Sequence, residues 1–323
     1  MIFRTRLPAP FGTMEFLRIG IHTSISGSLE KAALKAGELG ANTFQIFSSS
    51  PRMWRPSVLA KEDIVAMRHA RERLDLRPLV IHVNYLVNLA SLDPVIREKS
   101  ITSFRGELER AAAIGAEYLV THPGNCRGMD VDHAIAAFVL GMAEAVNGCT
   151  NSGVTVLLEN TAGCGAQIGC RLEELRAIRD LAQRKTHLRI GYCLDTCHLL
   201  AAGFDVANDA GLEQTVMHAD RVLGLENVKV IHTNDSKTPL GSHVDRHENI
   251  GEGHIGVEGF RRILAHQKLQ TKPFILETPV DEEGDDLRNV QKLKSLCPAQ
   301  PNKSPMRNVK PGSKSGASRR SAC

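Results

Sequence analysis

The chain has 323 residues, of which 42% are hydrophobic and 24% are charged. That length and apolar content suit one large α/β barrel or two medium-sized domains. No stretch of about 18 consecutive apolar residues occurs, which excludes a transmembrane helix and a membrane partner. The first residues, MIFRTRLPAPFG, lack the apolar core of a secretory signal.

The eight cysteines are expected to be reduced thiols, because the sequence shows no export signal. We therefore predict a cytoplasmic location. The segment CLDTC, residues 193–197, has CxxxC spacing within an apolar run. This context favours a strand followed by a turn, and a cysteine metal site is the less favoured alternative.

Positive charge is concentrated at the C-terminal end of the chain. Residues 298–323 contain six Lys and Arg residues and no Asp or Glu, whereas the formal net charge of the whole chain is +4. This segment is rich in Pro, Ser, Gly and Lys, so we predict a disordered basic tail. A solvating role is favoured over added affinity for phosphate. Residues 1–15 are expected to form an N-terminal extension, and Met14 is an alternative start.

Short apolar runs alternate with helical patterns between residues 16 and 297. Helices are predicted within 27–42 and 96–115, where apolar residues recur with a period of 3.6. Eight strands alternating with helices predict an α/β fold, a (β/α)8 TIM barrel that forms a single domain over residues 16–297. The expected strands are 16–22, 43–47, 79–83, 117–122, 154–160, 188–195, 228–234 and 273–278.

Ligand-capable side chains stand at the ends of seven of these eight strands. For any single position, a core residue with its hydrogen bonds satisfied is the simpler interpretation. Seven together favour a site, because buried imidazoles and carboxylates are costly unless they are paired or bind a metal. The carboxyl ends of TIM-barrel strands meet at one face, where active sites form. The seven residues are His22, His82, His122, Glu159, Asp195, His232 and Glu277.

The loops after the sixth and seventh strands add further candidate ligands. Asp195 and His198 are three residues apart, and Asp245 and His247 are two apart, so that in an extended loop both point the same way. Together with the strand ends other than His22, they make nine candidates, more than one zinc ion needs. A cluster of two or three zinc or manganese ions suits displacement at phosphorus, because the metals stabilise both the attacking and the leaving oxygen.

Three segments resemble signatures of the endonuclease IV family, the type 2 apurinic/apyrimidinic endonucleases. They are HVNYLVNLA (82–90), GYCLDTCH (191–198) and IHTNDSKTPLGSHVDRH (231–247), of which the last is long and highly specific. The resemblance covers nearly the whole predicted barrel. Val87 and Tyr192 depart from the usual residues of the family, but neither is a ligand.

The resemblance implies a TIM barrel with a trinuclear zinc site, although the ligand types leave manganese possible in part of it. A hydroxide activated by the metals would attack the phosphodiester 5′ to an abasic site in duplex DNA and leave 3′-hydroxyl and 5′-deoxyribose phosphate ends. Glu159 would bridge two metals, and Glu277 would orient the nucleophile. The implied ligand sets are His82, His122 and Glu159; Glu159, Asp195, His232 and Glu277; and His198, Asp245 and His247.

The resemblance also assigns the DNA contacts. Arg52, in SPRMW, would act as a wedge at the lesion with Trp54 nearby, and Tyr85 and Leu86 would be the other inserted pair. Without the family resemblance, packing beneath a loop would be a better interpretation of Tyr85 and Leu86 than insertion into DNA. An abasic nucleotide has no base to stack, so flipping it out costs less than flipping an intact one. The family precedent is a monomer.

Two rival functions stay open on the sequence. A divalent-metal sugar isomerase or epimerase on the same barrel would use part of the ligand set, but it needs neither the DRH segment (245–247) nor the Tyr85–Leu86 pair. A non-catalytic protein that binds damaged DNA would be favoured by a lost ligand, and all nine positions are filled.

Overall fold

The computed structural model describes residues 17–56, 58–125, 127–149 and 153–298. The predicted N-terminal extension and all but the first residue of the predicted basic tail lie outside these residues. In the described part of the chain, no helix combines the length and apolarity that a membrane crossing requires.

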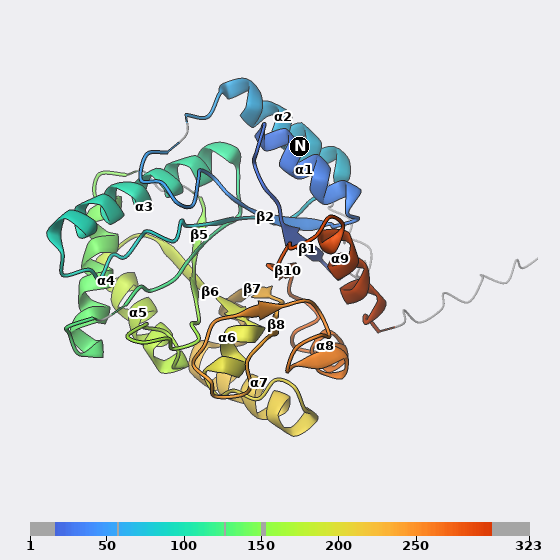
Figure 1. The fold of residues 1–323 in the computed structure, drawn as a ribbon. Coiled ribbons are helices and arrows are strands. Elements are labelled where there is room, and N and C mark those ends of the chain that lie inside the picture. Colours follow the sequence, from blue (N-terminus) through green and yellow to red (C-terminus); the bar gives the residue numbers. More distant parts are fainter. Residues whose placement is uncertain (1–16, 57, 126, 150–152, 299–323) are drawn as a thin grey trace, which may run out of the picture.

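Eight parallel strands within the described residues close into a barrel, and the helices form a ring around it (Figure 1). The order around the barrel is β1-β10-β7-β6-β5-β4-β3-β2, so the chain travels once around it through helical crossovers. The predicted TIM barrel is confirmed, and each predicted strand contains the observed one. The strands are β1 (Ile19–His22), β2 (Thr43–Phe47), β3 (Leu79–His82), β4 (Tyr118–Thr121), β5 (Thr155–Glu159), β6 (Arg189–Asp195), β7 (Val228–His232) and β10 (Phe274–Leu276).

Local sequence signals explain where the outer helices begin and end. Ser28 accepts a hydrogen bond from the backbone N–H of Lys31 and thereby caps α1. Asp93 caps α3, Pro94 occupies its first turn, and Gly115 ends it in the left-handed conformation with φ +82°. The outer helices are α1 (Leu29–Glu38), α2 (Lys61–Leu74), α3 (Pro94–Ile114), α4 (Val131–Val146), α5 (Leu172–Lys185), α7 (Asp209–Leu223), α8 (Gly256–Ala265) and α9 (Asp285–Ser295).

The core has two parts, which follow from the alternation of side chains along each strand. In β3, Leu79 and Ile81 face outward and join the large cluster between strands and helices, whereas Val80 faces inward. The inward cluster is completely buried and fills the barrel below its carboxyl end. It consists of Val80, Val120, Leu157, Cys193, Val230 and Ile275.

Short elements at the carboxyl end of the barrel carry the remaining candidate ligands. Helix α6 (Thr196–Ala201) follows β6 directly. A two-stranded antiparallel ribbon, β8 (Asp235–Ser236) and β9 (His247–Glu248), follows β7. The short 3-10 helix η1 (Leu225–Asn227) precedes β7 at the opposite end of the barrel.

Asp235 anchors this ribbon from inside the protein. Its carboxylate is fully buried and accepts hydrogen bonds from the backbone N–H groups of Ser236, Gly251, Gly253, Ile255 and Gly256. The glycine-rich segment 251–256 therefore wraps around a carboxylate of the same chain. An added Cβ at Gly253 would lie 2.6 Å from Asp235 Oδ1, which explains the glycine at this position.

Replacing Asp235 with Ala should lower the free energy of unfolding by about 3 kcal/mol or more, because several buried N–H groups would lose their acceptor at once. Urea denaturation measures the change. Glu252→Ala, which removes an exposed carboxylate from the same segment, is the matched control and should change stability by no more than about 0.5 kcal/mol. Equal stability of the two variants would show that the carboxylate does not hold the segment.

Candidate metal centre

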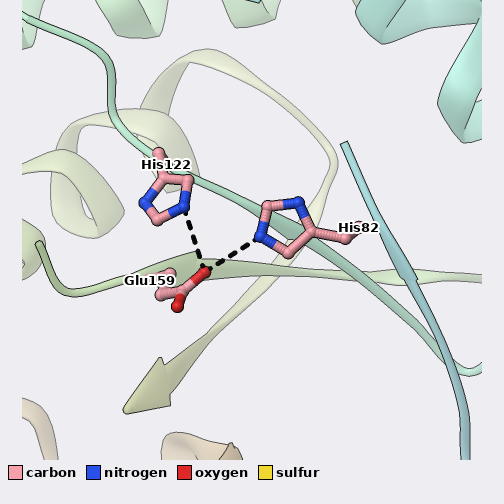
Figure 2. Close-up of side chains that lie close together, drawn as sticks. All are labelled: His82, His122 and Glu159. Atoms are coloured by element: carbon pink, nitrogen blue, oxygen red, sulfur yellow. Dashed lines mark hydrogen bonds and ion pairs between the residues drawn. The ribbon is translucent and has the colours of Figure 1, made fainter. Parts of the chain in front are cut away.

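The first group of candidate ligands joins three neighbouring strands. Glu159 ends β5, His82 ends β3, and His122 directly follows β4. Glu159 Oε2 lies 3.1 Å from His82 Nε2 and 3.5 Å from His122 Nε2, and both rings point toward the carboxylate (Figure 2). A ligand atom from each of the three lies within 4.8 Å of the others, a spacing compatible with one shared cation.

The second group shares Glu159 with the first. The other oxygen of Glu159, Oε1, lies 2.8 Å from His232 Nδ1, and that nitrogen is 3.2 Å from Glu277 Oε2. Asp195 completes this group, again with ligand atoms within 4.8 Å of one another. Because Glu159 offers one oxygen to each group, it has the position of a bridging ligand.

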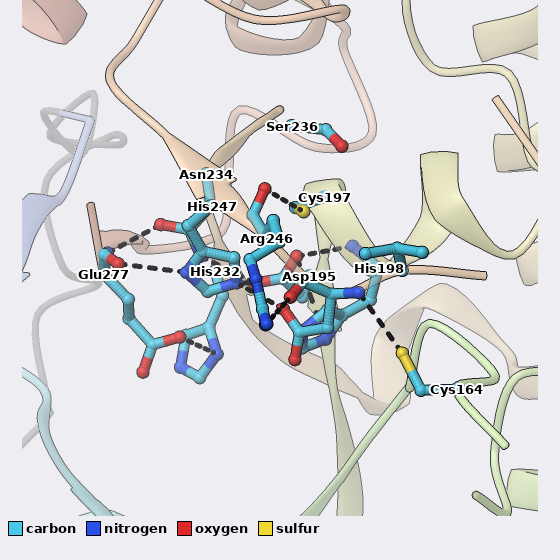
Figure 3. Close-up of polar contacts among 12 residues, drawn as sticks. Cys164, Asp195, Cys197, His198, His232, Asn234, Ser236, Arg246, His247 and Glu277 are labelled. Atoms are coloured by element: carbon cyan, nitrogen blue, oxygen red, sulfur yellow. Dashed lines mark hydrogen bonds and ion pairs between the residues drawn. The ribbon is translucent and has the colours of Figure 1, made fainter. Parts of the chain in front are cut away.

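The third group comes from α6, from β9 and from the segment just before β9, and Figure 3 shows its His198 and His247. His198 Nε2 lies 3.1 Å from Asp245 Oδ2, and His247 Nε2 lies 3.5 Å from Asp245 Oδ1. Cys197 forms an alternative group with Asp195 and His247, while Cys193 points into the apolar cluster. The two cysteines of CLDTC therefore do not act as a pair: Cys193 lies in β6, and Cys197 lies in a helix where a turn was expected.

Four of the five candidate histidines have one ring nitrogen fixed by a carbonyl oxygen. Such a bond orients the ring so that the second nitrogen faces the cluster, where it can bind a metal once it has lost its proton. Apart from their ion-pair contacts with Asp195 and Asp245, the buried Nε2 atoms of His198 and His247 have no hydrogen-bond partner among the described residues. The fixing bonds run from His82 Nδ1 to Val83 O (2.7 Å), from His198 Nδ1 to Asn160 O (3.0 Å), from His247 Nδ1 to Glu277 O (3.0 Å) and from His232 Nε2 to Gln45 Oε1 (2.8 Å).

The electrostatics of the centre favour cations. Burial alone would raise the pKa of Glu159, but His232 and His122 hold that pKa well below its usual value. Burial would likewise lower the pKa of His198, yet Asp195 and Asp245 raise it well above normal. Glu159 is thus ionised and His198 retains a proton, as expected where positive charge is needed to balance buried anions. For His122 burial has the larger effect and lowers the pKa.

Gln45 is a central residue that the sequence analysis missed. It is fully buried in β2, the one strand that contributed no candidate. Its amide donates to Glu277 Oε1 (2.5 Å), lies 3.0 Å from His22 Nδ1, and accepts from His232 through Oε1. The only signal was a lone polar residue at the centre of the apolar run TFQIF. The amide of Gln45 therefore connects His22, the remaining strand-end histidine, to the candidate ligand Glu277. His22 Nδ1 itself lies 3.9 Å from Glu277 Oε1.

Two asparagines that directly follow strands orient the carboxylates. Asn160 Oδ1 accepts a hydrogen bond from the backbone N–H of Asp195 (2.7 Å). Asn234 donates from Nδ2 to Asp195 Oδ2 (2.6 Å) and accepts from the backbone N–H of Glu277 (2.7 Å). Partners of this kind fix the direction in which a ligand presents its oxygen atoms.

Of the three residues predicted to contact DNA, Tyr85 lies at the mouth of this centre. A pocket of about 310 Å³ opens onto the ligands, and Tyr85 and Arg246 help to line it. The Tyr85 side chain is 67% exposed and its ring lies 5.2 Å from that of Phe47. Leu86 is half-buried, and Arg52 is exposed in the turn after β2. The expectation that Tyr85 packs beneath a loop does not fit this exposure.

Comparison with known proteins agrees with the fold. The family model described as Xylose isomerase-like TIM barrel matches residues 33–296. A protein of Solibacter usitatus named "Probable endonuclease 4" is 65% identical over 281 residues, which make up 87% of this chain and 97% of that protein. The chain belongs to the endonuclease IV family. A relative with the same name from Methanoculleus marisnigri is 41% identical over 281 residues, or 87% of this chain and 99% of the relative.

Solved structures separate the family from the wider fold. Endonuclease IV from Thermus thermophilus matches with a TM-score of 0.76 and 39% identity, covering 86% of this chain and 98% of that one. A D-tagatose 3-epimerase-like protein matches with a TM-score of 0.63 but only 19% identity, covering 86% and 96%. The second likeness shows a shared barrel and nothing about chemistry.

Gln45→Leu should weaken metal retention by roughly 10- to 100-fold, because His232 and Glu277 lose the amide that orients them. Metal content after dialysis against a graded series of chelator concentrations measures the effect. Gln183→Leu, which alters an exposed residue of α5, is the matched control and should retain metal like the unaltered chain. Unchanged retention in Gln45→Leu would remove this residue from the account of the centre.

Proposed function

We propose that this endonuclease IV family member cleaves the phosphodiester bond 5′ to abasic sites in duplex DNA and leaves 3′-hydroxyl and 5′-deoxyribose phosphate ends. Its family membership makes it a DNA-cleaving hydrolase of DNA repair. The observation that carries the finer proposal is the grouping of nine His, Asp and Glu side chains into three adjoining sets, two of which share Glu159.

The donor atoms fit three zinc ions, with manganese an alternative at part of the centre. The sets contain imidazole and carboxylate donors at spacings that a single cation can bridge, and zinc accepts both donor types. When bound, the metals would lower the pKa of the attacking water and neutralise charge that develops on the phosphate. The proposed ligands are His82, His122 and Glu159; Glu159, Asp195, His232 and Glu277; and His198, Asp245 and His247.

Two carboxylates have different proposed roles. Glu159 is completely buried, with its two oxygens directed to different groups, which suits a bridging ligand. The Glu277 side chain is 16% exposed and lines the pocket, so its ionised carboxylate can accept a hydrogen bond from the nucleophile and orient it. Gln45 and His22 hold Glu277 from behind and limit the directions in which it can turn.

The exposed residues around the pocket are proposed to select the lesion. Tyr85 has an exposed ring supported by Phe47, and inserting such a planar group into the base stack kinks a duplex. Leu86 and Arg52 would insert beside it. Abasic sites are favoured because no base has to be unstacked when the sugar enters the pocket.

A cytoplasmic location and a monomeric state complete the proposal. All nine candidate ligands come from one chain, so the centre does not require a second copy. Unpaired thiols suit a reducing compartment, and the cysteines without a disulfide in the described residues are Cys149, Cys164, Cys170, Cys193, Cys197 and Cys297.

The proposed activity predicts incision of a duplex that carries one stable abasic analogue, immediately 5′ to the lesion, by protein with about three metals per chain. Glu159→Gln should lose at least one metal and roughly three orders of magnitude in cleavage, since two groups lose a shared ligand. Gel analysis of the ends and metal quantification test both, with exposed Glu144→Gln as control. No incision by fully metallated protein would favour the sugar isomerase alternative, to be tested with polyols and aldoses.

Tyr85→Ala should weaken binding to the abasic duplex by roughly tenfold while metal content stays unchanged, because an intercalated aromatic ring contributes about 1–3 kcal/mol of stacking. Fluorescence anisotropy with abasic and intact duplexes measures the preference. Met217→Ala, which removes an exposed apolar side chain from α7, serves as the control. If Tyr85→Ala keeps the full preference for the lesion, Tyr85 is not a wedge.

A further inference from the structure

Both loops that carry the proposed wedge residues are hydrogen-bonded to the same helix. The β2 loop (residues 48–56) contains Arg52, and the β3 loop (residues 83–93) contains Tyr85 and Leu86. Helix α3 contacts both loops through side chains spaced three, four and three residues apart, which places them on one face. This α3 polar stripe consists of Ser100, Ser103, Glu107 and Arg110.

The β2 loop is fixed by the two stripe residues nearer the C-terminal end of α3, Glu107 and Arg110. The Glu107 carboxylate is 1% exposed and accepts hydrogen bonds from the hydroxyl groups of Ser48 and Ser49, the latter at 3.3 Å. Arg110 pairs with Glu107 at 2.9 Å and donates from Nε to Ser48 Oγ (2.7 Å). Two buried charges and two buried hydroxyl groups thus hold the point where this loop leaves β2.

The β3 loop is fixed by the other two stripe residues, Ser100 and Ser103. Asn84 donates from Nδ2 to Ser103 Oγ (2.9 Å), and its Oδ1 accepts from the backbone N–H of Leu86 (3.0 Å). Ser100 Oγ accepts from the backbone N–H of Asn88 (2.9 Å). One amide therefore connects α3 directly to the backbone of a proposed wedge residue.

The α3 polar stripe adds little to the stability of the helix itself. A buried ion pair contributes little net stability, because the desolvation of both charges offsets their attraction. Gly106, one turn before Arg110, lowers the helix propensity of α3 as well. An added Cβ at this position would lie 2.9 Å from Arg110 Nη1, so the glycine leaves room for the paired guanidinium.

We propose that the α3 polar stripe is a brace that fixes the β2 loop and the β3 loop relative to each other, so that their wedge residues reach one lesion together. The inference rests on the proposed function for the identity of those residues. The four stripe residues act as positioning residues, because none of them lies among the candidate ligands or lines the pocket in front of them.

Two double variants release one loop each. Glu107→Met with Arg110→Met removes both charges and keeps most of the side-chain volume, and Ser100→Ala with Ser103→Ala removes the contacts to the β3 loop. Each should raise KM for the abasic duplex roughly tenfold, with kcat within about threefold and an unchanged metal content. Binding to intact duplex should change less than about twofold. The four substitutions together should raise KM by less than the product of the two separate effects, because the loops serve one insertion.

A partly buried ion pair elsewhere, in which the side chain of Arg71 is 10% and that of Glu117 is 41% exposed, controls for the loss of an ion pair as such. Arg71 and Glu117 are joined at 2.7 Å near the amino end of β4, and Arg71→Met with Glu117→Met should leave KM and lesion preference unchanged. Unchanged KM in both stripe variants, or a fall in kcat with loss of metal, would overturn the brace.

Hydrogen exchange separates failure of the brace from failure of the proposed function. Even if the unaltered protein does not incise abasic duplex, exchange of the β2 loop should become faster in the Glu107/Arg110 variant, and that of the β3 loop in the Ser100/Ser103 variant. Exchange rates equal to those of the unaltered protein and the control pair would show that α3 does not hold the loops.

Discussion

The metal centre depends on the two-residue alternation of side chains along the barrel strands. Six interior residues form a closed apolar layer, and the residue two positions later on each of these strands is a candidate ligand on the same interior side. A slip of one residue in any strand would turn its ligand toward the outer helices. The layer Val80, Val120, Leu157, Cys193, Val230 and Ile275 thus supports His82, His122, Glu159, Asp195, His232 and Glu277.

The position of these side chains concentrates carboxylates in the buried interior at the carboxyl end of the barrel. Glu159 and Asp195 are fully buried, and nearby carboxylates raise the pKa of His82 and of His198, so that these two rings retain protons. Cations that replaced those protons would relieve the same imbalance, so binding of metal would couple to stability of the fold. The amides of Gln45 and Asn234 are suited to this position, because they orient ionised ligands without adding charge to the centre.

The sequence was sufficient for the barrel and for the candidate ligands, because both depend on short-range patterns. Short apolar runs between helical patterns predicted the eight strands, and the polar residues at their ends indicated which side chains converge. Gln45 was missed because one polar residue within an apolar strand has no periodicity to reveal it. The contacts of Glu107 with Ser48 and Ser49 join positions 58 or more residues apart, and no local pattern predicts such pairing.

The proposed chemistry and the proposed selectivity lie on different parts of this molecule. The ligands are mostly fixed by strand ends, which the barrel holds rigidly, whereas the proposed wedge residues lie on loops outside it. Sugar epimerases share the barrel at 19% identity or less, so the barrel alone does not determine the substrate. A flexible loop would lose conformational entropy each time it bound a lesion, and this loss would weaken binding. Hydrogen bonds from one helix to both loops would lower that cost, which gives a physical reason for burying Glu107 and Arg110 away from the metal centre.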